Sequence, residues 1–274
     1  MFSLNTSRTI LDRIKDLFVQ DIPYDLRSID GDWSKYFGSF DNQIWGKWDS
    51  KSCWALSAIN CLEDQLEFLW SNNYFSEESK TFFKENGYID EDGDFSISER
   101  FIEIISGVKD KGCSQKKAWD LMFKYGILPR SKLSYSDERA LKFSNNEDFV
   151  KDYFNESEIT DDMLNIAEQS KKFIDIKSKW INFGSKMPSI DTLRKALRQA
   201  PLQFGLAVPK HIFLWGRTGI IEWDGGTVAN HAVECYHIDD NGVFEIFDQY
   251  TPNKKLLSKD YYIPYISQGI VFVK

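Results

Sequence analysis

Apolar residues recur at helical spacing in the first half of the chain. In residues 53–70 they stand three or four positions apart, at Leu56, Ile59, Leu62, Leu66 and Leu69. This spacing puts them on one face of a helix, so a long helix is predicted there. Residues 98–106 and 117–125 show the same pattern, and Gly126 is placed to end the second of these helices.

The pattern changes after a short predicted helix at residues 192–198. Residues 202–206, 232–236 and 243–247 alternate between apolar and other residues, which is typical of half-buried strands. Turn-forming sequences separate these strands, namely Gly225-Gly226, Asp240-Asn241-Gly242 and Thr251-Pro252-Asn253. The pattern predicts an antiparallel sheet, which we expect to curl into a half-barrel.

The predicted fold class is α+β, with a helical lobe at about residues 40–150, a β lobe at about 190–274 and a cleft between them. Residues 140–185 are rich in Asp, Glu, Lys and Asn. They are interpreted as an insertion with one or two helices that covers the surface between the lobes. Residues 1–21 are interpreted as an N-terminal helical extension, because the apolar residues of 8–20 gather on one side of a helix.

Composition narrows the class of protein. A chain of 274 residues with 42% hydrophobic residues can bury a sizeable core, in one large domain or two small lobes. The net charge of −8 argues against a nucleic-acid partner, which requires clustered Lys and Arg. No apolar run is long enough to predict a membrane span, and charged residues near the N-terminus argue against a secretory signal.

Neither a metal nor a cofactor is expected. Cys and His are too few and too scattered for a zinc pattern, and no glycine-rich phosphate loop precedes a Lys-Ser/Thr pair. The polar stretch 76–94 ends in the acidic run Asp90-Glu91-Asp92-Gly93-Asp94. Its spacing differs from that of an EF-hand, so a surface turn is predicted there instead of a calcium site.

Candidate chemistry begins with Cys53, at the start of the long predicted helix. A helix N-terminus favours the thiolate, and a histidine can take the thiol proton. His231 opens a predicted strand about 180 residues later, an order that fits a Cys-His pair. A lone cysteine is more often a small buried hydrophobe. The other two histidines, His211 and His237, are interpreted as surface residues.

The residues around this pair resemble the papain-like cysteine peptidases. Cys53-Trp54-Ala55-Leu56-Ser57-Ala58 is similar to the Cys-Trp-Ala-Phe-Ser-Ala that begins the family's central helix. Other similar segments follow in the family order: Ile22-Pro23-Tyr24-Asp25-Leu26-Arg27, Asn42-Gln43, Ile97-Ser98-Glu99-Arg100, Tyr125-Gly126-Ile127, Pro201-Leu202, Asn230-His231-Ala232-Val233, Phe247-Asp248-Gln249-Tyr250 and Gly269-Ile270-Val271-Phe272. The resemblance covers residues 22–274 and implies the papain-like two-lobe fold.

The resemblance also implies catalytic roles. Cys53 would be the nucleophile and His231 the general base and acid. Asp248 stands in the place of the family's Asn and would orient His231, and its charge should raise the imidazolium pKa. The oxyanion would be bound by the backbone N–H of Cys53 and the side-chain amide of Gln43.

The substrate-binding residues implied by the resemblance are Trp54, Gly112, Asn230 and Tyr250. Trp54 and Tyr250 would shield the catalytic pair from water. Gly112 is what remains of a double glycine that lines the family's substrate cleft, because Cys113 follows it here. This departure puts recognition of the substrate backbone by that wall in question.

Two further departures concern the region before the nucleophile. Lys47 occupies the position of the family's oxyanion Gln, so Gln43 can replace it only through a four-residue insertion within residues 44–52. Trp45 and Trp48 in this insertion are interpreted as packing residues, with a substrate shelf as the alternative.

The second departure is Ser50, which replaces a cysteine that secreted members pair in a disulfide. Cys61, Cys113 and Cys235 are therefore interpreted as buried free thiols, and a cytoplasmic or other reducing compartment is expected.

The predicted function is that of a thiol hydrolase that cleaves a peptide or isopeptide bond through a thioester, with a peptide or protein as its substrate. Two alternatives stay open. One is a papain-fold binding or structural component with little turnover, for example of a viral particle. The other is an amidase that acts on cell-wall peptide.

Overall fold

The computed structural model describes residue 28 and residues 30–38, 43–109, 111–184, 186–209 and 214–274. The predicted N-terminal extension and the segment at residues 22–27 lie outside these residues, as does His211.

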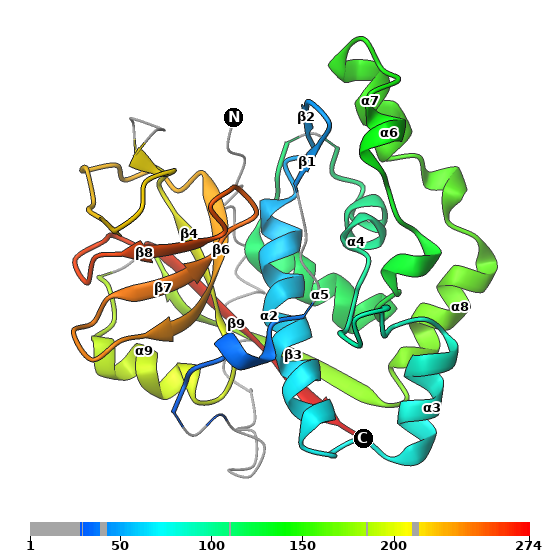
Figure 1. The fold of residues 1–274 in the computed structure, drawn as a ribbon, viewed down its shortest axis with the longest axis horizontal. Coiled ribbons are helices and arrows are strands. Elements are labelled where there is room, and N and C mark those ends of the chain that lie inside the picture. The colour runs from blue at the N-terminus through cyan, green and yellow to red at the C-terminus, as the bar shows by residue number, and fades with distance from the viewer. Residues whose placement is uncertain (1–27, 29, 39–42, 110, 185, 210–213) are drawn as a thin grey trace.

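The described part of the chain contains helices and strands in a mixed order (Figure 1). The helices are α2 (Cys53–Ser71), α3 (Glu77–Glu85), α4 (Glu99–Ser106), α5 (Gln115–Tyr125), α6 (Asp137–Ala140), α7 (Asn146–Tyr153), α8 (Asp161–Ser170) and α9 (Ile190–Leu197). The strands are β1 (Ile44–Trp45), β2 (Trp48–Asp49), β3 (Ile174–Phe183), β4 (Leu202–Leu206), β5 (Ile220–Ile221), β6 (His231–Ile238), β7 (Phe244–Phe247), β8 (Lys254–Leu257) and β9 (Tyr265–Val273).

Helix α2 lies at the centre of the molecule. It contacts β4, β6 and β9 on one side and α4 and α5 on the other, and it stands between the sheet and the helices in Figure 1. Every residue of α2 from Cys53 to Leu69 is buried. Its acidic residues therefore need partners: the Glu63 carboxylate accepts the Ile97 N–H at 2.6 Å, and that of Glu67 accepts the Phe95 N–H.

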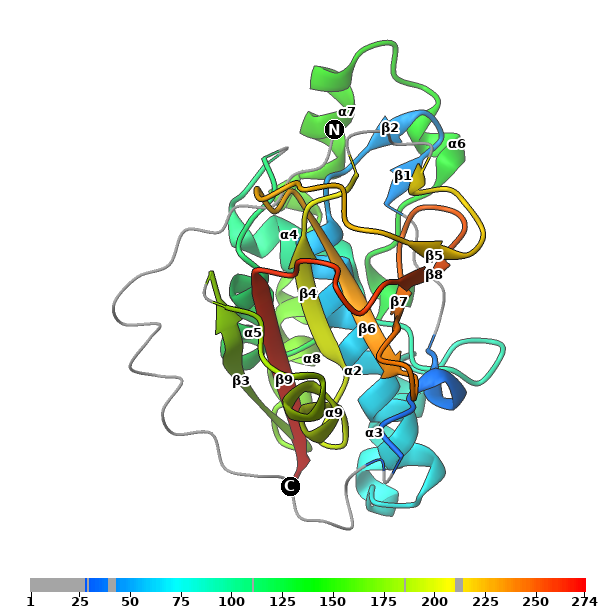
Figure 2. The same cartoon turned by 90° about the vertical axis from the view of Figure 1, so that its left-hand side faces the viewer.

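The main sheet has seven strands in the order β3-β9-β4-β6-β7-β8-β5 (Figure 2). All neighbours are antiparallel except β5 and β8, which run parallel. This arrangement confirms the predicted fold class, with a largely antiparallel sheet that has α2 and α5 on one face and α9 on the other (Figure 2). The predicted strands at 202–206, 232–236 and 243–247 correspond to β4, β6 and β7.

Two segments differ from their sequence-based prediction. Strand β3 lies in the range interpreted as a surface insertion, yet it pairs with β9 along its whole length and belongs to the sheet. Residues 76–94, predicted as a surface turn, begin with helix α3, which Ser76 caps by accepting the Ser79 N–H. The acidic end is a turn as predicted, and in it one Asp90 oxygen accepts three backbone N–H groups.

The insertion before Cys53 is a two-residue hairpin. Strands β1 and β2 pair antiparallel, and Gly46 turns the chain with a φ of 61°, which favours glycine. The ring of Trp48 stacks on Phe149 of α7 with the ring centroids 6.0 Å apart, and Trp45 packs against Tyr135 at 5.7 Å. Both tryptophans therefore pack in the small aromatic cluster between the hairpin and α6–α7, as the packing interpretation predicts.

The buried side chain of Gln203 helps to connect the sheet to the helices. Gln203 of β4 donates from its amide nitrogen to the Trp54 carbonyl at 2.9 Å and to the Ser57 hydroxyl at 2.8 Å. Its amide oxygen accepts from Trp119 of α5 at 3.0 Å and from Ser267 of β9 at 2.9 Å. All four bonds are buried, so the first turn of α2 is fixed against both the sheet and α5.

Candidate active site

Cys53 is the first residue of α2. The Ser52 carbonyl accepts the N–H groups of Ala55 at 2.7 Å and Leu56 at 2.9 Å, which starts the helix sharply at this point. The N–H groups of the first turn have no partner further back in the helix, and they carry its partial positive charge. The thiol therefore lies at the helix end that stabilises an anion.

His231 and Asp248 meet at the start of β6. Strand β7 runs antiparallel to β6 with Phe247 opposite Glu234, so the residue that follows β7 comes back toward the first residue of β6. The His231 Nε2 lies 2.7 Å from the Asp248 Oδ1, and both side chains are fully buried. This bond occupies Nε2, so Nδ1 is the ring nitrogen left for the Cys53 side chain, which hydrogen-bonds the imidazole.

The charge state of His231 follows from these neighbours. Burial disfavours the imidazolium, but the Asp248 carboxylate and the Cys53 side chain, which hydrogen-bonds the ring, outweigh it and raise the pKa of His231 to about 9. The pKa of Asp248 is lowered: burial alone would raise it, and His231 and a buried lysine overcome that effect. The structure thus brings the side chains of Cys53, His231 and Asp248 together in one hydrogen-bonded row.

Tyr250 covers the Cys53–His231–Asp248 group from one side. Its ring centroid lies 5.3 Å from that of His231. Its hydroxyl donates to the Asp49 Oδ2 at 2.8 Å and accepts from the Gln43 Nε2 at 2.7 Å. The ring is therefore held in place from the hairpin, in keeping with a shielding role.

Gln43 lies beside Tyr250, but its amide is already engaged. The two hydrogens of its Nε2 go to Tyr250 and to the Asp49 Oδ1, each at 2.7 Å. The hairpin insertion causes this, because it places Asp49 within reach of the amide. An oxyanion would have to displace one of these bonds, so the role of Gln43 stays a prediction.

The remaining predicted substrate residues are placed as follows. Trp54 is 2% exposed and belongs to the main core. Gly112 is buried and has a φ of 61° just before α5, a left-handed conformation that glycine adopts readily. Asn230 accepts the Val208 N–H at 3.0 Å through its side-chain oxygen and so fixes the chain before His231. Contact of these residues with a substrate stays a prediction.

The other three cysteines lie outside the Cys53–His231–Asp248 group. Cys61, Cys113 and Cys235 are buried free thiols, and burial raises the pKa of each. Among the residues that the structure describes, no three His, Cys, Asp or Glu side chains are grouped so as to hold a metal ion. No described helix combines the length and the apolar character needed to cross a bilayer.

Two residues of the site are missing from the sequence-based prediction. The indole of Trp215 donates to the Asp248 Oδ2 at 2.6 Å, and the Lys255 ammonium lies 2.9 Å from the same oxygen. In the sequence, Lys255 belongs to the pair Lys254-Lys255 beside a polar turn, a pattern that is typical of a solvated surface. Its alternation with Leu257 on one face of β8 is the signal that could have placed it inside.

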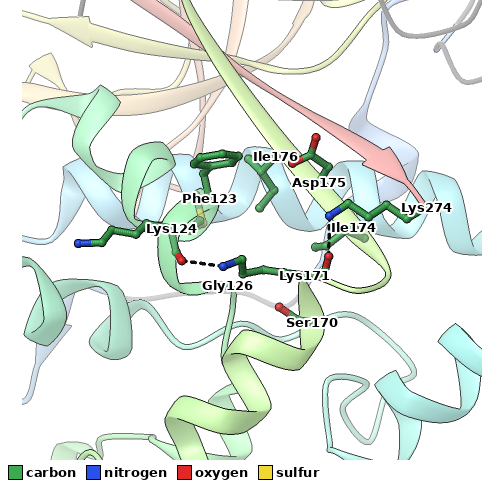
Figure 3. A pocket seen from close by; sticks show the side chains of 10 residues that line it. Phe123, Lys124, Gly126, Ser170, Lys171, Ile174, Asp175, Ile176 and Lys274 are labelled. Atoms are coloured by element: carbon green, nitrogen blue, oxygen red, sulfur yellow. Dashed lines mark hydrogen bonds between the residues drawn. The ribbon is translucent and has the colours of Figure 1, made fainter. Parts of the chain in front are cut away.

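A separate cavity of about 390 Å³ lies between the C-terminal ends of α5 and α8, the start of β3 and the end of the chain (Figure 3). The Lys171 and Lys274 ammonium groups donate to the backbone carbonyls of Lys124 at 2.9 Å and of Lys171 at 2.7 Å. None of the residues that line it is a predicted site residue, so this cavity is distinct from the Cys53 site.

Comparison with solved structures identifies proteins of similar fold. Xylellain, a cysteine protease from Xylella fastidiosa, aligns over 100% of this chain and 95% of its own, with a TM-score of 0.61 and 16% identity. The Amb a 11 cysteine protease, a ragweed pollen allergen in its proform, aligns over 95% of this chain and 74% of its own, with a TM-score of 0.56 and 16% identity. Bromelain from Ananas comosus, in complex with the E64 inhibitor, aligns over 89% and 97%, with a TM-score of 0.52 and 13% identity.

These neighbours define the class: the chain has the fold of the papain-like cysteine proteases. No family model matches the sequence, and no curated protein sequence matches it either. At 13–16% identity the likeness concerns the fold.

Proposed function

We propose that this protein is a thiol hydrolase that cleaves a peptide or isopeptide bond. The observation that carries the proposal is the buried row of side chains from Cys53 through His231 to Asp248, at the helix end that stabilises an anion. A core cysteine would need neither a basic partner nor a carboxylate behind that partner. The fold of the neighbouring cysteine proteases supports the same reaction class.

The reaction would proceed in two steps. His231 takes the proton of Cys53, and the thiolate attacks the carbonyl carbon of the scissile bond. The imidazolium then gives this proton to the leaving amine, which leaves an acyl thioester on Cys53. Water attacks the thioester, His231 takes a proton from that water, and the carboxylic acid departs as the thiol is restored.

Selective labelling tests the nucleophile. An epoxysuccinyl thiol-protease inhibitor, or iodoacetamide at pH 6, should modify Cys53 before the other three thiols, because Cys53 alone hydrogen-bonds a basic imidazole. Peptide mass spectrometry locates the label, and His231→Ala should slow the reaction at Cys53 while leaving the other three unchanged. Equal labelling of all four thiols in the native protein would contradict the mechanism.

Turnover separates the proposal from its alternatives. A panel of fluorogenic peptides, an isopeptide-linked peptide and a cell-wall peptide covers the substrate classes. Cleavage that Cys53→Ala abolishes supports the hydrolase and identifies its class of bond. If Cys53 is labelled selectively and no substrate is cleaved, a binding component with a relic site becomes the better interpretation.

Gln43 can be tested separately. If its amide binds the oxyanion, Gln43→Ala should lower kcat by about 10²–10³-fold, as the loss of one such donor does in other enzymes. Tyr250→Phe removes the hydroxyl that Gln43 and Asp49 share but keeps the ring over His231, so its loss in kcat should be smaller. Equal losses in the two variants would mean that Gln43 acts only by holding Tyr250.

A further inference from the structure

Asp248 is bonded on both of its oxygens. Oδ1 faces His231 and also accepts the Tyr250 N–H at 3.2 Å. Oδ2 faces away from the imidazole and receives Trp215 at 2.6 Å and Lys255 at 2.9 Å. The carboxylate is thus held between a cation that can move its proton in catalysis and a second cation on the far side.

Lys255 is built into this position by strand β8. Phe247 lies opposite Lys254, and Ile246 lies opposite Lys255, so the two lysines point to opposite faces of the sheet. Lys254 is exposed, whereas the Lys255 side chain is fully buried. The Lys255 ammonium group also donates to the carbonyls of Tyr250 and Pro252, which with Asp248 accounts for its three hydrogens.

A buried lysine requires a reason, because removing an ammonium group from water is costly unless it is paired. Here its partner is the same carboxylate that orients His231. Without Lys255, the buried negative charge of Asp248 would act on His231 alone. That would bind the imidazolium proton more tightly and make the ring a weaker acid toward the leaving group.

We propose that Lys255 is a positioning residue of this site: its ammonium pairs with Asp248, so that the two side chains together present His231 with a fixed and electrically compensated hydrogen-bond acceptor. This inference rests on the proposed function, since it assigns Lys255 to the same reaction. Lys255 touches no reacting atom in this scheme and acts only through Asp248.

Within the part of the chain that the structure describes, four charged or titratable groups lie at or near His231 besides Lys255. Cys53 faces it from α2, Asp248 and Tyr250 face it from the segment after β7, and Asp49 stands behind the Tyr250 hydroxyl. Lys255 contributes the positive charge on the side of Asp248 away from the ring. Removing it should therefore stabilise the imidazolium, and removing Asp248 should destabilise it.

The test compares four proteins: wild type, Lys255→Met, Asp248→Asn and the double variant. The first readout is the alkaline limb of the pH profile of kcat/KM. The second is the titration midpoint of the His231 ring protons by NMR, which requires no turnover and which a His231→Ala spectrum assigns. In Lys255→Met both should move upward by about one pH unit, and in Asp248→Asn both should move downward.

Lys254→Met is the matched control, because it removes the same charge from the neighbouring residue on the exposed face of β8. Solvent screens that charge, so the midpoint should stay within about 0.3 pH units of wild type. An unchanged midpoint in Lys255→Met, or the same shift in both lysine variants, would overturn the inference.

The double variant tests whether the two side chains act as a pair. Each single variant leaves one member of the buried Asp248–Lys255 pair without the other, whereas Asp248→Asn with Lys255→Met removes both charges of that pair. The double variant should therefore unfold at a higher temperature than either single variant, a comparison that holds even if Lys255→Met folds poorly. A melting temperature at or below that of the lower single variant would overturn the pairing.

The outcomes also separate the inference from the proposed function. If no substrate is cleaved and the His231 midpoint still rises in Lys255→Met, the pairing stands and the hydrolase proposal fails. If cleavage is found and the midpoint does not move, the hydrolase proposal stands and the role of Lys255 fails.

Discussion

Two buried carboxyl sites lie on or beside strand β6, and they are held in opposite states. At one end, Asp248 receives His231, Trp215 and Lys255, and its pKa is lowered. Further along, Glu234 faces Asp64 of α2, and burial raises the pKa of both, that of Glu234 to about 7. Two carboxyl groups can hydrogen-bond each other only when one of them is protonated.

The difference shows that burial alone does not decide the charge of an acidic side chain. Asp248, Asp64 and Glu234 are all buried, with 0%, 1% and 0% exposure. What differs is the partner: cationic donors keep Asp248 ionised, while a second carboxyl group keeps the Asp64–Glu234 pair partly protonated. Asp248 is thus ionised beside the site where proton transfer is proposed, whereas the Asp64–Glu234 pair keeps a proton inside the packed core.

The largest expected effect is on activity. Asp248→Ala should lower kcat/KM by about 10²–10⁴-fold, because His231 loses the group that orients it for proton transfer. Glu234→Gln keeps the shape of a protonated carboxyl on the same strand and should change kcat/KM less than about threefold. Steady-state kinetics on one peptide substrate checks both. Equal activities for Asp248→Ala and wild type would mean that Asp248 only closes the turn after β7.

A smaller effect is expected on stability. Lys255→Met leaves the Asp248 charge short of a buried partner and should lower the free energy of unfolding by about 3–5 kcal/mol. Glu234→Gln removes no charge partner and should lower it by about 1 kcal/mol or less. Urea unfolding at pH 6 measures both. A greater loss for Glu234→Gln would mean that this pair is ionised in the folded protein.

The last expected effect is a dependence of stability on pH, which is small over any single pH unit. Glu103 is buried near the hydroxyls of Ser52 and Tyr153, and burial raises its pKa to about 8. The folded state therefore holds this proton between pH 4.5 and 8, where the unfolded chain has released it. Stability from this group is full below pH 4.5 and is lost as the pH rises toward 8, by at most about 1.4 kcal/mol per pH unit.

Glu103→Gln should flatten this slope, because an amide does not titrate. His231 adds a slope of the same sign between about pH 6.5 and 9, since its pKa is raised in the folded state. The comparison of wild type with Glu103→Gln at pH 5, 6.5 and 8 isolates the carboxyl contribution. An identical slope in the two proteins would show that Glu103 is ionised when folded.

The strongly periodic elements could be predicted from the sequence. Helix α2 has apolar residues at every turn, and β4 and β6 lie between clear turn signals. The pattern of apolar residues and turns is therefore enough to predict these elements. Helix α3 was missed because only Ser79 and Phe83 are buried along it, which leaves little apolar period to detect. Strand β3 was missed because it is an edge strand, half-exposed for most of its length and rich in lysine.

The site divides in the same way. Short motifs mark Cys53, His231 and Asp248 in the sequence, and the structure places their side chains together, while their catalytic roles stay a prediction. Lys255 and Trp215 carry no motif, and only the pairing of β7 with β8 shows that Lys255 points inward. The engagement of Gln43 by Asp49 depends on the conformation of a hairpin that the sequence indicated only as an insertion.

The hydrogen bonds of Gln203 limit how far the helical half and the sheet of this protein can be exchanged with those of another protein. The amide of this β4 residue bonds to α2, α5 and β9, so elements from both halves of the chain are matched to each other at this buried point. A chimera that combined the helices of this protein with the sheet of a distant homologue would have to keep a glutamine there, together with all four of its acceptors and donors. The halves are therefore expected to be inherited and engineered as one unit, even though the reacting groups come from both.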